Sequence, residues 1–182
     1  MLDVEHPQQR WRGGIVTEIS RSASDRTGGC QCGRIRYAFS GEPVEVTVCH
    51  CRMCQKAVGG QFITLVQLRP GQIVWTRGTP GEFRSSSIAT RLFCRDCGTP
   101  LAYVDDDTGA LEVTSGSLDD PTRAVPTRAT GTETMLHWIG AVTSLPSRTT
   151  EQNYANRKKR PVVSLQHPDH DTPPDWTPSA GT

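Results

Sequence analysis

The sequence is poor in the residues that build a large core and has no long apolar run. Hydrophobic residues make up 35% of its 182 positions and aromatic residues only 6%, which suggests that part of the chain contributes little to a core. No segment approaches the roughly 20 apolar residues that span a bilayer. The first residues, MLDVEHPQQRWRGG, also lack the apolar region of a signal peptide. We therefore expect one cytoplasmic domain with polar tails.

The chain also lacks a net charge that would attract partners of one sign. It has 20 basic and 19 acidic residues, for a formal net charge of +1, so no global field favours nucleic acid or a membrane surface. One basic cluster, NRKKRP at residues 156–161, is short and has no interleaved aromatic residues. We expect neither nucleic acid nor a membrane as a partner. The oligomeric state does not follow from the sequence.

Short β-prone runs separated by turn residues dominate the middle of the chain. They follow one another at spacings of roughly ten residues, as RIRYAFS, VEVTVC, QFITLVQL, QIVWTR, GEFRSSS, TRLFC, PLAYV and ALEVTSGSL. This pattern predicts a mainly β domain of short antiparallel strands with little helix over residues 28–144. Residues 1–27 are predicted to be a flexible arm, and the Pro- and Ser-rich residues 145–182 a C-terminal extension that is partly disordered or peripheral.

Only two short helical turns are expected. The first lies in CRMCQKAVGG, which Gly59 and Gly60 would end. The second lies in SLDDPTR, with Ser117 or Asp119 as its cap and Pro121 near the first helical position. Neither turn would form a helical layer.

The seven cysteines are the strongest functional signal. In a reducing compartment closely spaced thiols more often hold a metal than form disulfides, and an odd count leaves one thiol over in any full pairing. Two short-spaced pairs are each followed by glycine: Cys30 with Cys32 in CQCG, and Cys94 with Cys97 in CRDCG. We predict that these four thiols hold one structural zinc. The alternative is that they are free buried cysteines acting as small hydrophobic residues.

The remaining cysteines, Cys49, Cys51 and Cys54, lie in the stretch CHCRMC. Their spacing allows all three to reach one ion, and three protein ligands with an open position are typical of catalytic zinc. His50 lies between two of them and would point the opposite way in an extended segment, so we do not expect it to complete the site. The alternative is a purely structural zinc completed from elsewhere in the chain.

Four stretches, GGCQCGRIRYAFSGEP, CHCRMCQKAVGG, LFCRDCGTPLAY and GSLDDP, resemble the motifs of the glutathione-dependent formaldehyde-activating enzyme family, which includes centromere protein V. The resemblance covers about residues 28–140. It implies a β-tent fold with a structural zinc held by the first and last cysteine pairs and a labile, catalytic zinc held by Cys49, Cys51 and Cys54. It also implies carbon–sulfur lyase chemistry, namely the condensation of formaldehyde with glutathione to S-hydroxymethylglutathione.

The expected partner is therefore a small-molecule thiol or its adduct. Two other functions stay open: a zinc-dependent hydrolase or lyase of another small adduct, and a non-catalytic zinc-stabilised module that binds a protein. After LHWIG the chain departs from the family pattern, which affects the expected substrate more than the expected zinc.

Several polar and aromatic side chains lie near the cysteines in sequence. Arg52 and Lys56 would attract a substrate carboxylate or would be solvated surface charges, and Gln55 would donate hydrogen bonds to a substrate. For Phe62 and Phe93 we expect a place in the core.

Overall fold

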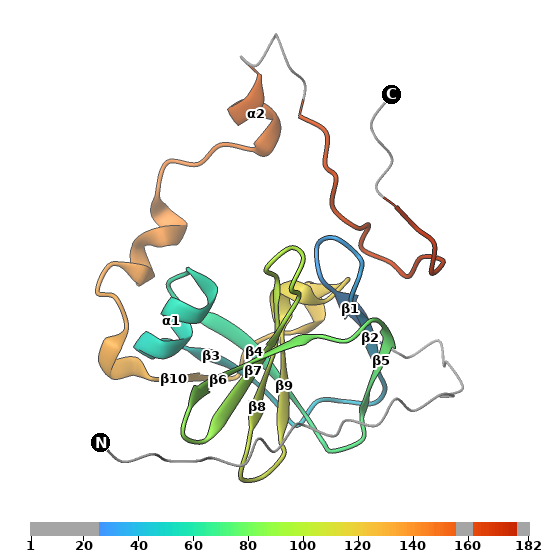
Figure 1. The fold of residues 1–182 in the computed structure, drawn as a ribbon. Coiled ribbons are helices and arrows are strands. Elements are labelled where there is room, and N and C mark those ends of the chain that lie inside the picture. Colours follow the sequence, from blue (N-terminus) through green and yellow to red (C-terminus); the bar gives the residue numbers. More distant parts are fainter. Residues whose placement is uncertain (1–25, 156–161, 178–182) are drawn as a thin grey trace, which may run out of the picture.

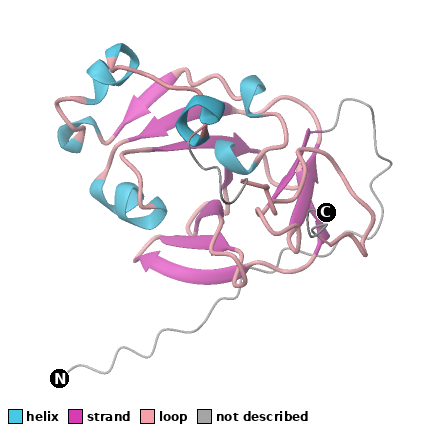
Figure 2. Ribbon diagram, turned by 90° about the horizontal axis from the view of Figure 1, so that it is seen from above, coloured by secondary structure: helices cyan, strands magenta, loops and turns pink. Residues whose placement is uncertain are grey.

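Two β-sheets form the body of the computed structural model, which describes residues 26–155 and 162–177 (Figures 1 and 2). The smaller sheet has the order β1-β2-β5 and contains β1 (Arg26–Gly29), β2 (Arg36–Phe39) and β5 (Ile73–Arg77). The larger sheet has the order β10-β3-β4-β9-β8-β7-β6. Its strands are β3 (Glu45–Cys49), β4 (Ile63–Leu68), β6 (Gly81–Ser86), β7 (Ala89–Phe93), β8 (Pro100–Asp105), β9 (Leu111–Thr114) and β10 (Arg128–Thr130). The prediction of a mainly β domain is confirmed.

Two edge strands differ from the sequence prediction. β10 pairs with β3 in parallel, with Thr130 opposite Cys49, so the expectation of antiparallel strands is wrong at this edge. β1 begins within the predicted arm and pairs with β2. Its sequence, RTGG, has low intrinsic β-propensity, so its strand conformation depends on the partner strand. The first 25 residues of the predicted arm and the basic cluster at 156–161 lie outside the described residues.

The larger sheet separates a main core from a second, smaller cluster. Because side chains alternate between the faces of a strand, Val66 and Val113 lie on the face that packs against Tyr37 and Phe39 of the smaller sheet. A separate cluster contains Ile63 and Leu65 of β4 together with Cys54 of α1 (Arg52–Val58). In Figure 1, α1 lies apart from β1, β2 and β5. The helix therefore covers a part of the larger sheet that the smaller sheet does not.

Both expected helical turns are present, although one cap was assigned incorrectly. α1 is capped by Cys51 and ends at Gly59, which has the left-handed conformation that glycine tolerates. The second turn is the 3-10 helix η2 (Pro121–Arg123), whose cap is Asp120 instead of Ser117 or Asp119.

The other helical segments are short: η1 (Ser115–Ser117), η3 (Thr132–Thr134), η4 (Ile139–Ser144) and α2 (Thr150–Tyr154). The sequence analysis did not predict α2, which begins with a capping box formed by Thr149 and Gln152. Within residues 26–155 and 162–177, no helix has the length and apolar character needed to cross a membrane.

Residues around His167 in the C-terminal extension pack against the turn between β1 and β2. The backbone N–H of His167 donates to the carbonyl of Gln31 at 2.7 Å. Arg77 donates to the carbonyls of Gly33 at 2.9 Å and Thr172 at 2.6 Å, which ties the turn and the extension together. A Cβ atom on Gly33 would lie 2.3 Å from the His167 ring. The glycine is therefore required for this close approach as well as for its positive φ of 74°.

A buried ion pair joins β2 to the segment after β9. The Arg36 side chain is 2% exposed. Its guanidinium donates to both carboxylate oxygens of Asp119, with Nη1 2.8 Å from Oδ1, and it also contacts Asp171. Burial raises the pKa of Asp119, but hydrogen bonds from Arg36 and Thr27 outweigh this effect and hold the pKa below its ordinary value. The carboxylate therefore stabilises the fold at neutral pH.

We expect Asp119→Ala to lower the free energy of unfolding by about 3 kcal/mol, because Arg36 would remain buried with only Asp171 as a carboxylate partner. Chemical denaturation at pH 7 measures this. The neighbouring Asp120 is a matched control, since it only caps η2, and Asp120→Ala should lose about 1 kcal/mol or less.

The same pair predicts a pH dependence. Asp119 has a folded-state pKa below its unfolded-state pKa, so its contribution is complete above the unfolded value and is lost as the pH falls through the folded value. The difference in stability between the wild type and Asp119→Ala should therefore shrink below about pH 4. A difference that is constant from pH 7 to pH 3 would contradict this account.

Candidate metal centres

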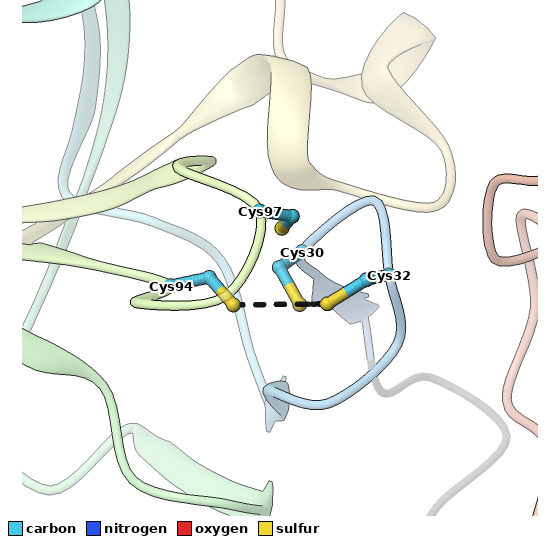
Figure 3. A group of neighbouring side chains, drawn as sticks. All are labelled: Cys30, Cys32, Cys94 and Cys97. Carbon is cyan, nitrogen blue, oxygen red and sulfur yellow. Dashed lines mark hydrogen bonds between the residues drawn. The ribbon is translucent and has the colours of Figure 1, made fainter.

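The two predicted cysteine pairs converge on one point, as Figure 3 shows. The Sγ atoms of Cys30, Cys32, Cys94 and Cys97, here named the four-cysteine cluster, all lie within 4.8 Å of one another. Cys32 Sγ is 3.4 Å from Cys30 Sγ and 3.7 Å from Cys94 Sγ. All seven cysteines are free. Four thiolates around zinc, with bonds of about 2.3 Å, lie roughly 3.8 Å apart in a tetrahedron, so this set of donors fits a zinc ion.

Both pairs sit in turns of the same design. Gly33 N donates to Cys30 O at 3.0 Å, and Gly98 N donates to Cys94 O at 2.9 Å. The two glycines have φ values of 74° and 76°, a region that residues with a side chain rarely adopt. In the first turn Ile35 N also donates to Cys30 Sγ at 3.3 Å. Such N–H donors favour the thiolate form that binds metal.

The thiols of the four-cysteine cluster have different pKa values because their surroundings differ. Burial raises the pKa of Cys97, but hydrogen bonds from Thr99, whose Oγ1 lies 3.2 Å from the sulfur, outweigh burial and lower the pKa to about 6. Burial raises the pKa of Cys32 and of Cys94. At neutral pH the metal-free cluster therefore holds a thiolate at Cys97, and a metal ion that recruits the other sulfurs would release protons.

The second group, here named the cysteine trio, forms where β3 meets α1. Cys49 is the last residue of β3, Cys51 is the N-cap of α1 and Cys54 lies in its first turn. Their Sγ atoms lie within 4.8 Å of one another, and among the described residues this group includes no fourth cysteine, histidine or carboxylate. Cys54 is buried, whereas Cys49 and Cys51 are partly exposed. The trio offers a metal three sulfur donors and partial access from solvent.

His50 lies between two of these cysteines but not in their group. Its side chain is buried against the ring of Phe62, with 5.6 Å between ring centroids. Phe62 itself is 41% exposed, so the expectation that it belongs to the core is wrong.

β10 and the residues that follow it lie against the trio. His50 N donates to Thr130 O at 2.8 Å. Burial raises the pKa of Cys49, but hydrogen bonds, the largest of them from the Thr130 hydroxyl, outweigh burial and lower the pKa. A Cβ on Gly131 would lie 2.5 Å from the backbone nitrogen of Cys51. Sequence reasoning missed this segment, because three residues, RAT, are too short to give a strand signal.

The side-chain amide of Gln55 donates its hydrogen bonds to backbone carbonyls next to the trio. Its Nε2 donates to His50 O at 2.7 Å and to Thr134 O at 3.0 Å, and the side chain is buried. The expectation that Gln55 donates to a substrate is therefore wrong. Arg52 is exposed and donates to Gln55 Oε1 at 3.2 Å, whereas Lys56 lines a cavity beside α1.

Arg91 is the charged group in contact with the trio. Its Nη2 donates to Cys54 Sγ at 3.4 Å, and its guanidinium lies 5.4 Å from the centre of the Tyr103 ring. Burial raises the pKa of the Cys54 thiol to about 12, against the opposing effect of Arg91. Sequence reasoning missed Arg91, because in TRLFC it occupies an ordinary polar position of an alternating strand. Only the pairing of β7 with β8 brings it to Tyr103.

We expect Gly131→Ala to reduce metal binding by the trio, because the new Cβ would displace the backbone of Cys51. Gly109→Ala is a matched control: Gly109 has a similar positive φ, but a Cβ there meets no atom within 4 Å. Both variants should lose about 1 kcal/mol of stability from the strained backbone, and Gly131→Ala should lose more because of the contact with Cys51. Only Gly131→Ala should lower the metal content, measured by cobalt–thiolate absorbance. Equal metal content in the two variants would show that this contact does not position Cys51.

Both cysteine groups lie within the part of the chain that matches a known protein family. A family model described as glutathione-dependent formaldehyde-activating enzyme matches residues 25–134. An uncharacterized lyase of Schizosaccharomyces pombe is 29% identical over 76 residues, which are 42% of this chain and 55% of that protein, so the match spans about half of the relative's length. A Rhodobacter sphaeroides crystal structure superposes with a TM-score of 0.47 and 19% identity over 57% of this chain and 99% of that chain. Because the family model spans more than half of the chain and both cysteine groups, the protein belongs to the glutathione-dependent formaldehyde-activating enzyme family.

Proposed function

We propose that the protein is a zinc-dependent carbon–sulfur lyase that forms or cleaves a small thiol–aldehyde adduct resembling S-hydroxymethylglutathione. The four-cysteine cluster would hold a structural zinc, and the cysteine trio would hold a second, exchangeable zinc at the reaction site. The family membership and the lyase-named relative support the reaction class. The observation that carries the proposal is that the trio presents three sulfur donors and no fourth among the described residues.

The difference between the two groups supports different roles for them. Four sulfurs close a tetrahedral site, which is typical of structural zinc. Three sulfurs leave one position for a substrate, and zinc bound there would supply a Lewis acid for a thiolate or a carbonyl oxygen. In the reaction the thiol sulfur bonds to the aldehyde carbon, the carbonyl π bond breaks, and the thiol proton is transferred to the resulting oxygen. The reverse reaction releases both partners.

The protein groups around the trio control negative charge on sulfur. The Thr130 hydroxyl donates to Cys49 and favours its thiolate. Arg91 holds a permanent positive charge 3.4 Å from Cys54 Sγ, and the Tyr103 ring packs against its guanidinium. Arg91 therefore acts as a positioning residue that stabilises the Cys54 thiolate when a metal binds.

The two groups should respond differently to the loss of one ligand. We expect Cys97→Ser to unfold or aggregate the protein, because it removes a ligand from a closed site in the main core. Cys54→Ser should stay folded while its zinc content falls from two equivalents toward one. Circular dichroism, thermal melting and metal analysis measure both effects. If Cys97→Ser melts like the wild type, or if Cys54→Ser collapses as well, the assignment of roles is wrong.

The reaction itself is testable by exchange spectroscopy. Formaldehyde, glutathione and their adduct interconvert without catalyst, so NMR exchange rates report any acceleration by the protein. We expect the wild type with two zinc equivalents to accelerate the exchange in proportion to its concentration. Cys54→Ser with one zinc should lose at least about tenfold. If the wild type holds two zinc ions and accelerates no thiol–aldehyde exchange, the proposed function fails.

A further inference from the structure

A largely apolar cavity of about 600 Å³ lies between α1 and the strands β6, β7 and β8. A volume of this size suits a small organic ligand. The apolar residues that line it include Met53, Ala57, Ile63, Phe83, Phe93 and Pro100. Phe83 is 62% exposed and Met53 is 60% exposed, so large apolar side chains at the cavity face solvent in the absence of a ligand.

The cavity adjoins the cysteine trio. Arg91 lines the cavity and donates to Cys54 Sγ. Phe83 is the cross-strand partner of Arg91 on β6, and Tyr103 is its partner on β8. Directly opposite residues lie on the same face of a sheet. Arg91 therefore lies between Cys54 and the apolar wall, while the three cysteines themselves do not line the cavity.

The composition of this wall does not match either reactant of the founding family reaction. Formaldehyde has no carbon chain that could contact it. Glutathione is a polar, charged tripeptide, and burying its carboxylates and amides against apolar side chains would leave them without hydrogen-bond partners. Lys56, Glu82 and Arg91 are the charged residues of the lining, and most of its surface is apolar. The wall instead matches an unbranched or aromatic hydrocarbon group.

On the basis of the proposed function, we infer that the aldehyde half of the adduct carries a hydrophobic chain, which occupies this cavity while the reacting carbon lies at the trio. The substrate class is then a thiol adduct of a medium-chain or aromatic aldehyde. Formaldehyde is a minimal substrate that leaves the cavity unfilled. Phe83 determines specificity for the chain.

The first experiment measures binding without chemistry. Primary alcohols from 1-butanol to 1-octanol carry the same chains but cannot form the adduct, and their dissociation constants follow from NMR titration of the metal-loaded protein. We expect binding to tighten about threefold per added methylene, with shifts centred on Met53 and Phe83. If affinity is independent of chain length, or if the shifts lie elsewhere, the inference is overturned.

Two variants of the β6–β7 hairpin provide the matched comparison. Phe83→Ala should reduce the gain per methylene and weaken 1-octanol binding by about tenfold. Ile88→Ala also removes an exposed apolar side chain, 47% exposed, from the same hairpin, but Ile88 does not line the cavity. It should bind the series like the wild type. Equal weakening by both variants would overturn the role of Phe83.

The same aldehyde series tests the link to catalysis. With glutathione held constant, kcat/KM should rise from formaldehyde to hexanal in the wild type and in Ile88→Ala, but much less in Phe83→Ala. A protein that accepts formaldehyde and hexanal equally would keep the proposed function and lose this inference. A protein that binds long alcohols in the cavity but accelerates no aldehyde exchange would keep the apolar site, lose the proposed reaction and overturn the substrate class inferred from it.

Discussion

The convergence of four thiols from two sheets is the constraint on which the rest of the fold depends. Cys30 and Cys32 lie in the turn after β1, in the smaller sheet, whereas Cys94 and Cys97 lie in the turn after β7, in the larger sheet. Cys32 and Cys94 are 62 residues apart. Cys30 and Cys94 are 2% and 0% exposed and belong to the main core. A metal ion held there would restrict the unfolded chain and fix one sheet on the other, which suits a chain with few hydrophobic residues.

Polar interactions also stabilise the region around the turn that contains Cys30 and Cys32. Arg36 follows the first cysteine turn and reaches both Asp119, after β9, and Asp171, in the C-terminal extension. His167 of the extension packs against Gly33 in that turn. The extension therefore contributes to the support of the four-cysteine cluster, although its composition suggested only a peripheral segment. Composition reports the lack of apolar residues and says nothing about hydrogen bonds from a side chain to backbone carbonyls, such as those from Arg77.

The sequence predicted the local features of the site better than its long-range contacts. The end of α1 at Gly59 follows from chain-local rules, and the positive φ of Gly33 and Gly98 occurs at the glycine that follows each cysteine pair in the sequence. In contrast, Arg91 and Gly131 reach the trio only through strand pairing and the parallel addition of β10. Neither residue lies in a motif near the trio cysteines. The missed strand β1 is similar, because RTGG becomes a strand only where β2 offers hydrogen bonds.

The alternation of side chains along β7 places a main-core residue and a residue that contacts the cysteine trio on opposite faces of one strand. Leu92 is 1% exposed and belongs to the main core, which also contains Cys94. Arg91, one residue earlier, points to the opposite face and contacts Cys54. Phe83, which pairs with Arg91 on the exposed side, is a wall of the cavity that does not belong to the main core. One family fold can then keep its two cysteine groups while the side chains beside the trio change.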